Sequence, residues 1–160
     1  MNQSRDIPGV IAPPPLIALA TLLLGLVLDW FLPSFFILRG ILGFGTRLII
    51  GATLIASGAT IAAVAIRSFL RVGTNVDPWK PAVSLVTTGI FAYTRNPMYL
   101  ALILILAGLA IALASDWMIV LLVPAALILH FGVVKREERY LAAKFAESYR
   151  DYVSKVSRYV

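Results

Sequence analysis

Two clusters of polar and charged residues interrupt an otherwise apolar sequence and contain the side chains best suited to chemistry. The first ends in an Arg-Asn-Pro run at 95–97, and the second is the run Lys-Arg-Glu-Glu-Arg at 135–139. The adjacent carboxylates of the second cluster, Glu137 and Glu138, can bind a cationic group and can accept a proton. The two clusters therefore contain the side chains that a site for a charged ligand requires.

Each cluster also has a purely structural interpretation, which the sequence by itself leaves open. Asn96 directly before Pro97 is a good helix start, because Asn caps unpaired amides and proline suits the first helical turn. Glu137 and Glu138 stand between cations, and such charge runs are commonly a solvated helix face. The segment 67–96 is nonetheless long for a connector, and long loops often bind ligands.

The composition of the chain excludes several classes of protein. Of 160 residues, 60% are hydrophobic and 14% are charged, and the mean hydropathy is +0.90, which is too apolar for an ordinary soluble domain. The net charge of +6 does not indicate nucleic-acid binding, because the cations flank apolar runs instead of forming a basic face. The absence of cysteine excludes disulfides, thiolate metal sites and a cysteine nucleophile, and we expect no metal site.

Four apolar segments are long enough to cross a bilayer core, which needs about 20 apolar residues in a helix. They run approximately over residues 14–32, 46–66, 97–114 and 117–134. Ser115 and Asp116 alone separate the last two segments, which predicts a tight antiparallel hairpin. The sequence therefore predicts a single domain, residues 1–160, of an all-α integral membrane protein with four transmembrane helices.

A charged, amphipathic stretch follows the fourth apolar segment without a glycine or proline break. Its apolar residues recur at three- and four-residue spacing, as on one face of a helix: Leu141, Phe145, Tyr149, Tyr152 and Val156. We expect a C-terminal amphipathic helix over 135–156 that packs on the membrane surface or on the segment 67–96. In the second apolar segment, several glycines and alanines predict close packing against another helix.

The lysines and arginines predict how the helices are oriented in the membrane. They gather in the loop 67–96 and after the fourth apolar segment, and Arg5 precedes the first, whereas the short connection between the last two has none. Since cytoplasmic segments carry an excess of cations, we expect both termini, this loop and the active site in the cytoplasm. Asp29 and His130 lie near ends of apolar segments, and each is either an interfacial residue or an ion-coupling site.

The two clusters and the residues that follow them resemble a known superfamily. The run from Thr88 to Tyr99 is followed one hairpin later by Arg136-Glu137-Glu138, and then by Phe145, Tyr149, Tyr152 and Arg158. This two-part pattern resembles the isoprenylcysteine carboxyl methyltransferase and phospholipid methyltransferase superfamily over residues 73–158. The first two apolar segments match it only as generic membrane helices.

The resemblance implies an integral membrane methyltransferase that uses S-adenosylmethionine and has no Rossmann domain. The implied partner is a lipophilic small molecule or a lipid, which reaches the site from the bilayer and accepts the methyl group on a carboxylate, amine or thiol. The implied cofactor-binding residues are Asn96, Pro97, Tyr99, Glu137 and Glu138, with Leu85, Val86 and Gly89 in a covering loop and Arg95 as a polar partner. The implied catalytic residues are Glu138, as a base for an amine acceptor, and Arg136.

Position 96 departs from the pattern of the superfamily, because Asn stands where His is usual. This difference argues against proton transfer by that side chain. Two other functions remain compatible with the composition: a small transporter that uses Asp29 or His130, and a noncatalytic scaffold whose basic C-terminal segment binds anionic lipid. Both of these leave the two-part pattern unexplained.

Overall fold

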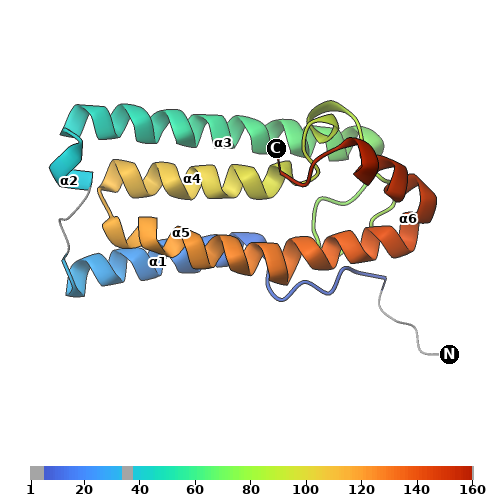
Figure 1. Cartoon of the computed structure of the whole chain (residues 1–160), viewed down its shortest axis with the longest axis horizontal. Coiled ribbons are helices and arrows are strands. Elements are labelled where there is room, and N and C mark those ends of the chain that lie inside the picture. Colours follow the sequence, from blue (N-terminus) through green and yellow to red (C-terminus); the bar gives the residue numbers. More distant parts are fainter. Residues whose placement is uncertain (1–5, 34–37, 160) are drawn as a thin grey trace.

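The computed structural model describes residues 6–33 and 38–159, and all regular secondary structure within them is helical. The elements in chain order are α1 (Pro14–Phe31), α2 (Leu38–Ile41), α3 (Phe44–Val72), η1 (Gly89–Ala92), α4 (Pro97–Leu113), α5 (Asp116–Leu129), η2 (His130–Val134) and α6 (Lys135–Lys155). The long helices α1, α3, α4 and α5 run side by side along the molecule (Figure 1). The loop between α3 and α4, η1 and α6 all lie at one end of this bundle, and α2 lies at the other. Arg5 lies outside the described residues.

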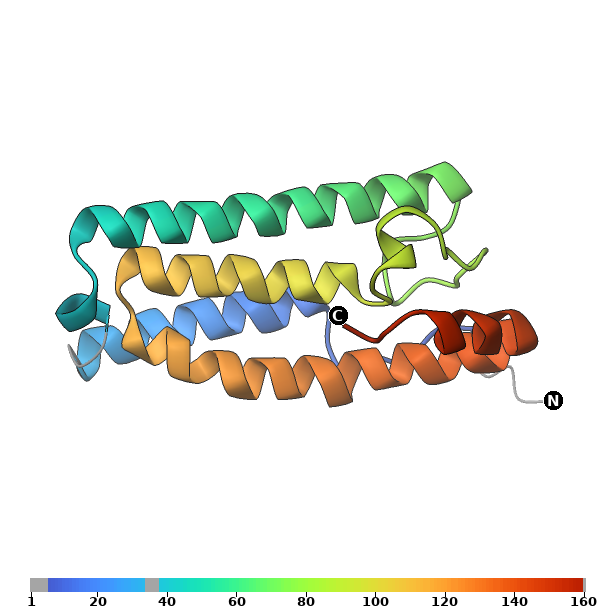
Figure 2. The ribbon, with the colours of Figure 1, turned by 45° about the horizontal axis from the view of Figure 1, so that its top comes forward.

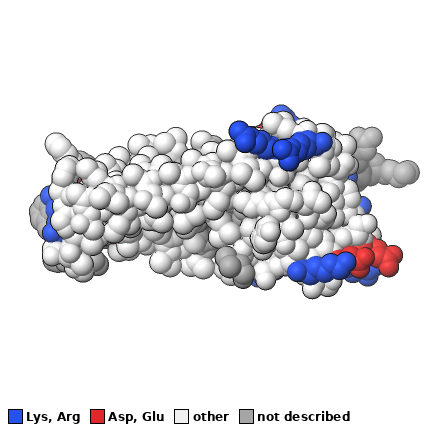
Figure 3. All heavy atoms as spheres, turned by 90° about the horizontal axis from the view of Figure 1, so that it is seen from above, with Lys and Arg blue, Asp and Glu red and all other residues white. Residues whose placement is uncertain are grey.

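Three helices in the described residues are long and apolar enough to cross a membrane: Pro14–Phe31, Phe44–Val72 and the continuous helix Asp116–Lys155. The remaining apolar helix, Pro97–Leu113, is shorter, at 17 residues. A wide belt without charged side chains covers the middle of the face seen in Figure 3, and most of the charges visible there lie toward the end that carries α6. Because lipid-facing surfaces must be apolar, the structure is that of an integral membrane protein.

The boundaries of the second apolar segment were predicted too narrowly. Helix α3 runs on for six residues beyond Ile66, because no helix-breaking residue occurs before Gly73. Gly73 has a φ of 70°, the left-handed conformation that commonly ends a helix, and its N–H donates to the carbonyl of Leu70 at 3.2 Å. The predicted hairpin between the last two apolar segments is present, and the Ser115 hydroxyl caps α5 by accepting from the N–H of Met118.

Helices α3 and α4 pack closely through small residues, as the sequence predicted. A methyl group on Gly51 would lie 2.7 Å from the carbonyl oxygen of Gly108, and one on Gly58 would lie 2.7 Å from that of Ala101. These approaches are possible because small side chains let helix backbones come close together in lipid. Helices α3 and α4 thereby form a closely packed pair, and the α3–α4 loop lies at the end of the pair where α4 begins.

The C-terminal amphipathic stretch is not one straight helix over 135–156. A π-helical turn, η2, links α5 to α6, and within α6 the backbone of Ala146 has φ 41° and ψ −108°, which is not helical. The chain turns back at this point, so that the second half of α6 returns toward η1 (Figure 2). Tyr149 and Tyr152 are buried there, and the Tyr152 hydroxyl donates to the carbonyl of Phe91 at 2.7 Å. Of the two packing partners expected for this stripe, these tyrosines pack on the segment 67–96.

Candidate functional site

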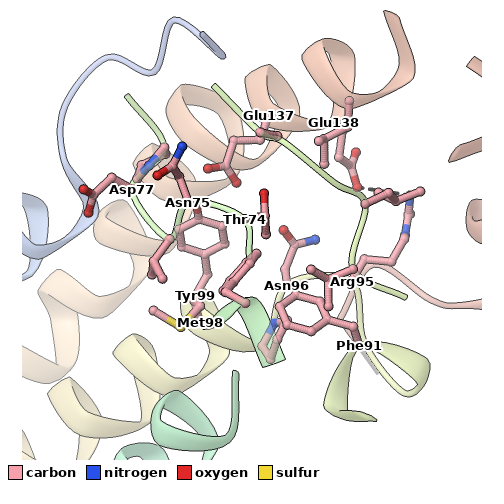
Figure 4. Close-up of a pocket in the computed structure, with 18 of the residues that line it drawn as sticks. Thr74, Asn75, Asp77, Phe91, Arg95, Asn96, Met98, Tyr99, Glu137 and Glu138 are labelled. Carbon is pink, nitrogen blue, oxygen red and sulfur yellow. Dashed lines mark ion pairs between the residues drawn. The ribbon is translucent and has the colours of Figure 1, made fainter. Parts of the chain in front are cut away.

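A cavity of about 230 Å³ lies at the loop-bearing end of the bundle, between the α3–α4 loop, the start of α4 and the first turns of α6 (Figure 4). Most of the site residues expected from the sequence line it: Leu85, Val86, Arg95, Asn96, Pro97, Tyr99, Glu137 and Glu138. The two clusters that lie about forty residues apart in the sequence therefore meet in one cavity. Figure 4 shows the side chains of Asn96 and Glu137 pointing into the same space from α4 and α6.

Two of the expected residues, Gly89 and Arg136, lie outside this lining. Arg136 faces the segment before α1 instead of the cavity. Its Nη1 donates to the carbonyl of Gly9 at 2.9 Å, which ties the segment before α1 to α6. Gly89 begins η1 with a φ of 64°, a conformation that favours glycine, so it shapes the loop beside the cavity.

The cavity is also lined by residues that were not among the predicted site residues. Thr74 is buried, and its hydroxyl oxygen accepts from the N–H of Val83 at 2.9 Å, which folds the loop over the cavity. Pro14 and Pro15 at the start of α1 line the opposite side. The loop residues belong to the polar run 73–81, which begins the first cluster of the sequence, whereas nothing in the sequence placed the start of α1 next to α4.

The side chain of Asn96 does not cap helix α4, although the residue occupies the capping position. Its Nδ2 instead donates to the carbonyl oxygen of Arg158 at 3.0 Å, and the Thr94 hydroxyl donates to the same oxygen at 3.3 Å. Within α4, which the structure describes in full, no hydrogen bond from this side chain to the helix amides is present. The capping interpretation of Asn96 is therefore wrong, and the side chain links α4 to the segment after α6.

Glu138 lies between two arginines. Arg158 binds it in a bidentate manner, with Nε 3.0 Å from Oε1 and Nη2 2.8 Å from Oε2. Arg95 approaches from the start of α4, with Nη1 3.3 Å from Oε1. The side chain of Glu138 is 14% exposed, so its charge is largely out of water, and removing one of its arginine partners would be costly.

Glu137 has a different environment from its neighbour. The pKa of the Glu137 carboxyl is raised to about 7, chiefly by burial; a hydrogen bond from Tyr99 opposes this shift, and the nearby charge of Glu138 adds to it. The carboxyl therefore gains or loses its proton near neutral pH, which is where a proton-transferring group works best. A buried carboxylate of this kind also attracts a cationic ligand.

Arg95 supplies a donor to the same cavity. Its side chain is only 10% exposed, yet its Nε has no hydrogen-bond partner among residues 6–33 and 38–159. Buried donors are nearly always paired, so the guanidinium of Arg95, which lines the cavity, has hydrogen-bonding capacity that its protein neighbours do not use. The lining thus offers a buried acceptor, Glu137, and a buried donor, Arg95, to one ligand.

The sequence pattern of the phospholipid methyltransferase family matches residues 46–148, which is more than half of the chain. The chain belongs to the phospholipid methyltransferase family. The match extends from the start of α3 into α6, and it contains both halves of the two-part motif, with Arg95, Asn96, Glu137 and Glu138. Membership in this family indicates a membrane methyltransferase and confirms the resemblance to the larger superfamily. No curated protein and no solved structure gives a significant match to the chain.

Proposed function

We propose that the protein is an S-adenosylmethionine-dependent methyltransferase that acts on a lipophilic acceptor from the bilayer. One observation carries the proposal: both halves of the family motif line one cavity, and its lining includes a carboxyl, Glu137, and a guanidinium, Arg95. A ligand with a cationic group and a carboxylate would satisfy both. S-adenosylmethionine has this combination of charges.

The cavity suits that cofactor in chemistry as well as in charge. When bound, S-adenosylmethionine supplies an electrophilic methyl carbon attached to a positively charged sulfur. Arg95 would hold a carboxylate, and Glu137 would hold an ammonium or hydroxyl group through a charge-assisted hydrogen bond. Tyr99 presents an aromatic ring for contact with a cation, and Leu85 and Val86 cover the cavity and exclude water.

The two glutamates have separate roles in this proposal. Glu138 was the first candidate for a base, but the two arginines that bind it make it better suited to holding Arg95 in place. Glu137 is the carboxyl that exchanges a proton near neutral pH. An amine acceptor must lose a proton during methylation, and Glu137 would take it only where the cofactor's ammonium does not occupy that carboxylate, whereas a carboxylate acceptor needs no base.

The lining indicates how a lipophilic acceptor reaches the cavity. Pro14 and Pro15 of α1 face the cavity together with Tyr99 and Leu102 of α4. These residues continue the lining from its polar part toward the apolar belt of the bundle. The family name suggests a phospholipid amine as the acceptor, and an apolar carboxylate or thiol would use the same route.

The membrane arrangement belongs to the same proposal. Helices α1, α3, α4 and the α5–η2 segment would each cross the bilayer, and the turned-back α6 would rest at its surface as an amphipathic helix. Because the cavity lies at the end that carries the cations of loop 67–96 and of α6, the positive-inside rule places the active site in the cytoplasm.

Transfer of a radiolabelled methyl group from S-adenosylmethionine into a total lipid and metabolite extract tests this function. Membranes that contain the wild-type protein should label an organic-soluble product. Membranes with Glu137→Gln should label it much less, and membranes with Glu147→Gln, an exposed carboxylate of α6, should match the wild type. Absence of any labelled product with the wild type, under conditions where the protein is folded, would favour the transporter or scaffold.

A further inference from the structure

The short segment that follows α6 returns to the cavity from outside the family match. The carbonyl of Ser157 accepts from the N–H of Arg95 at 3.1 Å, and the carbonyl of Arg158 accepts from Nδ2 of Asn96 at 3.0 Å. Two residues that line the cavity are therefore held by a segment that does not itself line it. This segment, 157–159, is called the clasp below.

Arg158 connects the two halves of the family motif. Its carbonyl oxygen binds Asn96 at the start of α4, while its guanidinium binds both oxygens of Glu138 on α6. A guanidinium is planar, with a fixed fork of donors, so a bidentate pair of this kind fixes the orientation of the carboxylate as well as its charge. The lengths of 2.8–3.1 Å are those of well-formed charged hydrogen bonds.

The clasp is anchored on its far side by a second contact. The Tyr159 hydroxyl lies 2.7 Å from Nδ1 of His130, in the π-helical turn that leads into α6. A π-helical turn changes the helix register, and such turns occur frequently at functional sites. The clasp thus spans from His130 past Glu138 to Asn96, and Arg158 lies at its centre.

We propose that Arg158 is a positioning residue for the cofactor-binding site, acting through Glu138 and Arg95. The proposal rests on the proposed function. Arg158 and Arg95 share the carboxylate of Glu138, and because Arg158 holds both oxygens, the ion pair of Arg95 with Glu138 is limited to one contact of 3.3 Å. Without Arg158, Glu138 would draw Arg95 fully to itself, because a buried carboxylate needs compensating donors. The cavity would then lose the donor that recognises the carboxylate of the cofactor.

The test compares cofactor affinity, KM and kcat for Arg158→Gln, Arg158→Lys and the control Arg139→Gln, whose exposed guanidinium bonds to its own helix at Lys135. Arg158→Gln should weaken the binding of S-adenosylmethionine by about tenfold and raise its KM, with a smaller change in kcat. Arg158→Lys keeps the charge but not the fork, so it should recover part of the affinity. Arg139→Gln should bind like the wild type.

A double-mutant cycle with Glu138→Gln separates positioning from a general structural role. If Arg158 acts through Glu138, then Arg158→Gln should change the affinity little when Glu138 is already Gln. Fully additive losses would overturn the proposal, as would wild-type affinity in a folded Arg158→Gln variant. If Arg158→Gln does not fold, Arg158→Lys provides the test. Wild-type affinity in that variant would show that the bidentate pair of Arg158 with Glu138 is not required for cofactor binding, which would contradict the proposal. A wild-type protein that binds no S-adenosylmethionine would instead refute the proposed function itself, and the proposal for Arg158 with it.

Discussion

Arg158 and Glu138 form a bidentate ion pair, with Nη2 of the arginine 2.8 Å from Oε2 of the carboxylate. Glu137, the residue before it in the same helix turn, is instead buried against Tyr99 and has its pKa raised to about 7. Two adjacent glutamates thus have different environments, one compensated by arginines and one able to exchange a proton. Their environments, more than their order in the motif, divide the work of binding and proton transfer between them.

Cofactor binding should depend on pH through Glu137. Its raised pKa of about 7 means that the carboxyl is mostly protonated and neutral at pH 6 and mostly ionised at pH 8. A cationic ligand prefers the ionised form, so the affinity for S-adenosylmethionine should rise about tenfold from pH 6 to pH 8 and then level off. Calorimetry at pH 6 in buffers of different ionisation enthalpy should also detect proton release. In Glu137→Gln both effects should vanish, and a wild type with flat affinity would show that Glu137 does not face the cation.

The hydrogen bond between Asn96 and Arg158 predicts different effects for two substitutions at position 96. Ser is too short to replace the Nδ2 donor, so Asn96→Ser should lose several-fold in cofactor affinity, whereas Asn96→His retains a donor and should keep much of it. Asn96→Ser should also lower the melting temperature modestly, because it removes a buried hydrogen bond between the start of α4 and the segment after α6. The measurement is thermal unfolding alongside cofactor titration. Binding by Asn96→Ser that equals the wild type would remove this side chain from the site.

The close approach of α3 and α4 predicts a strong effect of adding one methyl group. A Cβ on Gly108 would lie 2.7 Å from the carbonyl oxygen of Gly51 and 2.8 Å from Cγ1 of Ile55, so Gly108→Ala should destabilise the protein by about 1–3 kcal/mol. Gly45→Ala, in the same helix pair but with nothing within 4 Å of the new atom, should leave stability unchanged or slightly raised. Thermal unfolding in detergent measures both, and equal melting temperatures would show that the helices do not touch there.

The membrane orientation can be tested with single cysteines, since the chain has none of its own. Lys80→Cys lies in the exposed part of the α3–α4 loop, and Ile41→Cys is 74% exposed in α2 at the opposite end of the bundle. A membrane-impermeant maleimide should label Ile41→Cys in intact cells and Lys80→Cys only after permeabilisation. Labelling of both from the same side would contradict the proposed topology.

Much of the bundle could be predicted from the sequence, because lipid requires nearly uniform apolar segments and leaves few alternatives. The predicted ranges of α1, α4 and α5 agree with the structure to within a few residues. The end of α3 was missed because its last turns carry Arg67 and Arg71, which look like the start of a loop although the helix continues. Charge marks the edge of the membrane, and that edge need not coincide with the end of a helix.

The candidate site could be predicted only for residues that belong to short, recognisable sequence motifs. Arg95, Asn96, Glu137 and Glu138 all line the cavity, as expected from the two-part pattern. Arg158 belongs to the same pattern, but its contacts with Glu138 and Asn96 could not be predicted, because they depend on the reversal at Ala146, a residue with no special preference for a positive φ. Without that reversal, nothing in the spacing of Arg158 and Glu138 brings the two side chains together. The carbonyl of Arg158 would then not be available to the side chain of Asn96, which would leave helix capping as its expected role.

The most direct test of the whole account is calorimetric titration of purified, membrane-reconstituted protein with S-adenosylmethionine. We predict one-to-one binding by the wild type, a loss of about ten- to a hundredfold for Arg95→Gln, because Arg95 lines the cavity, and no loss for Arg150→Gln, an exposed arginine of α6. Absence of binding by the folded wild-type protein, or equal binding by Arg95→Gln, would contradict the assignment of this cavity as the cofactor site.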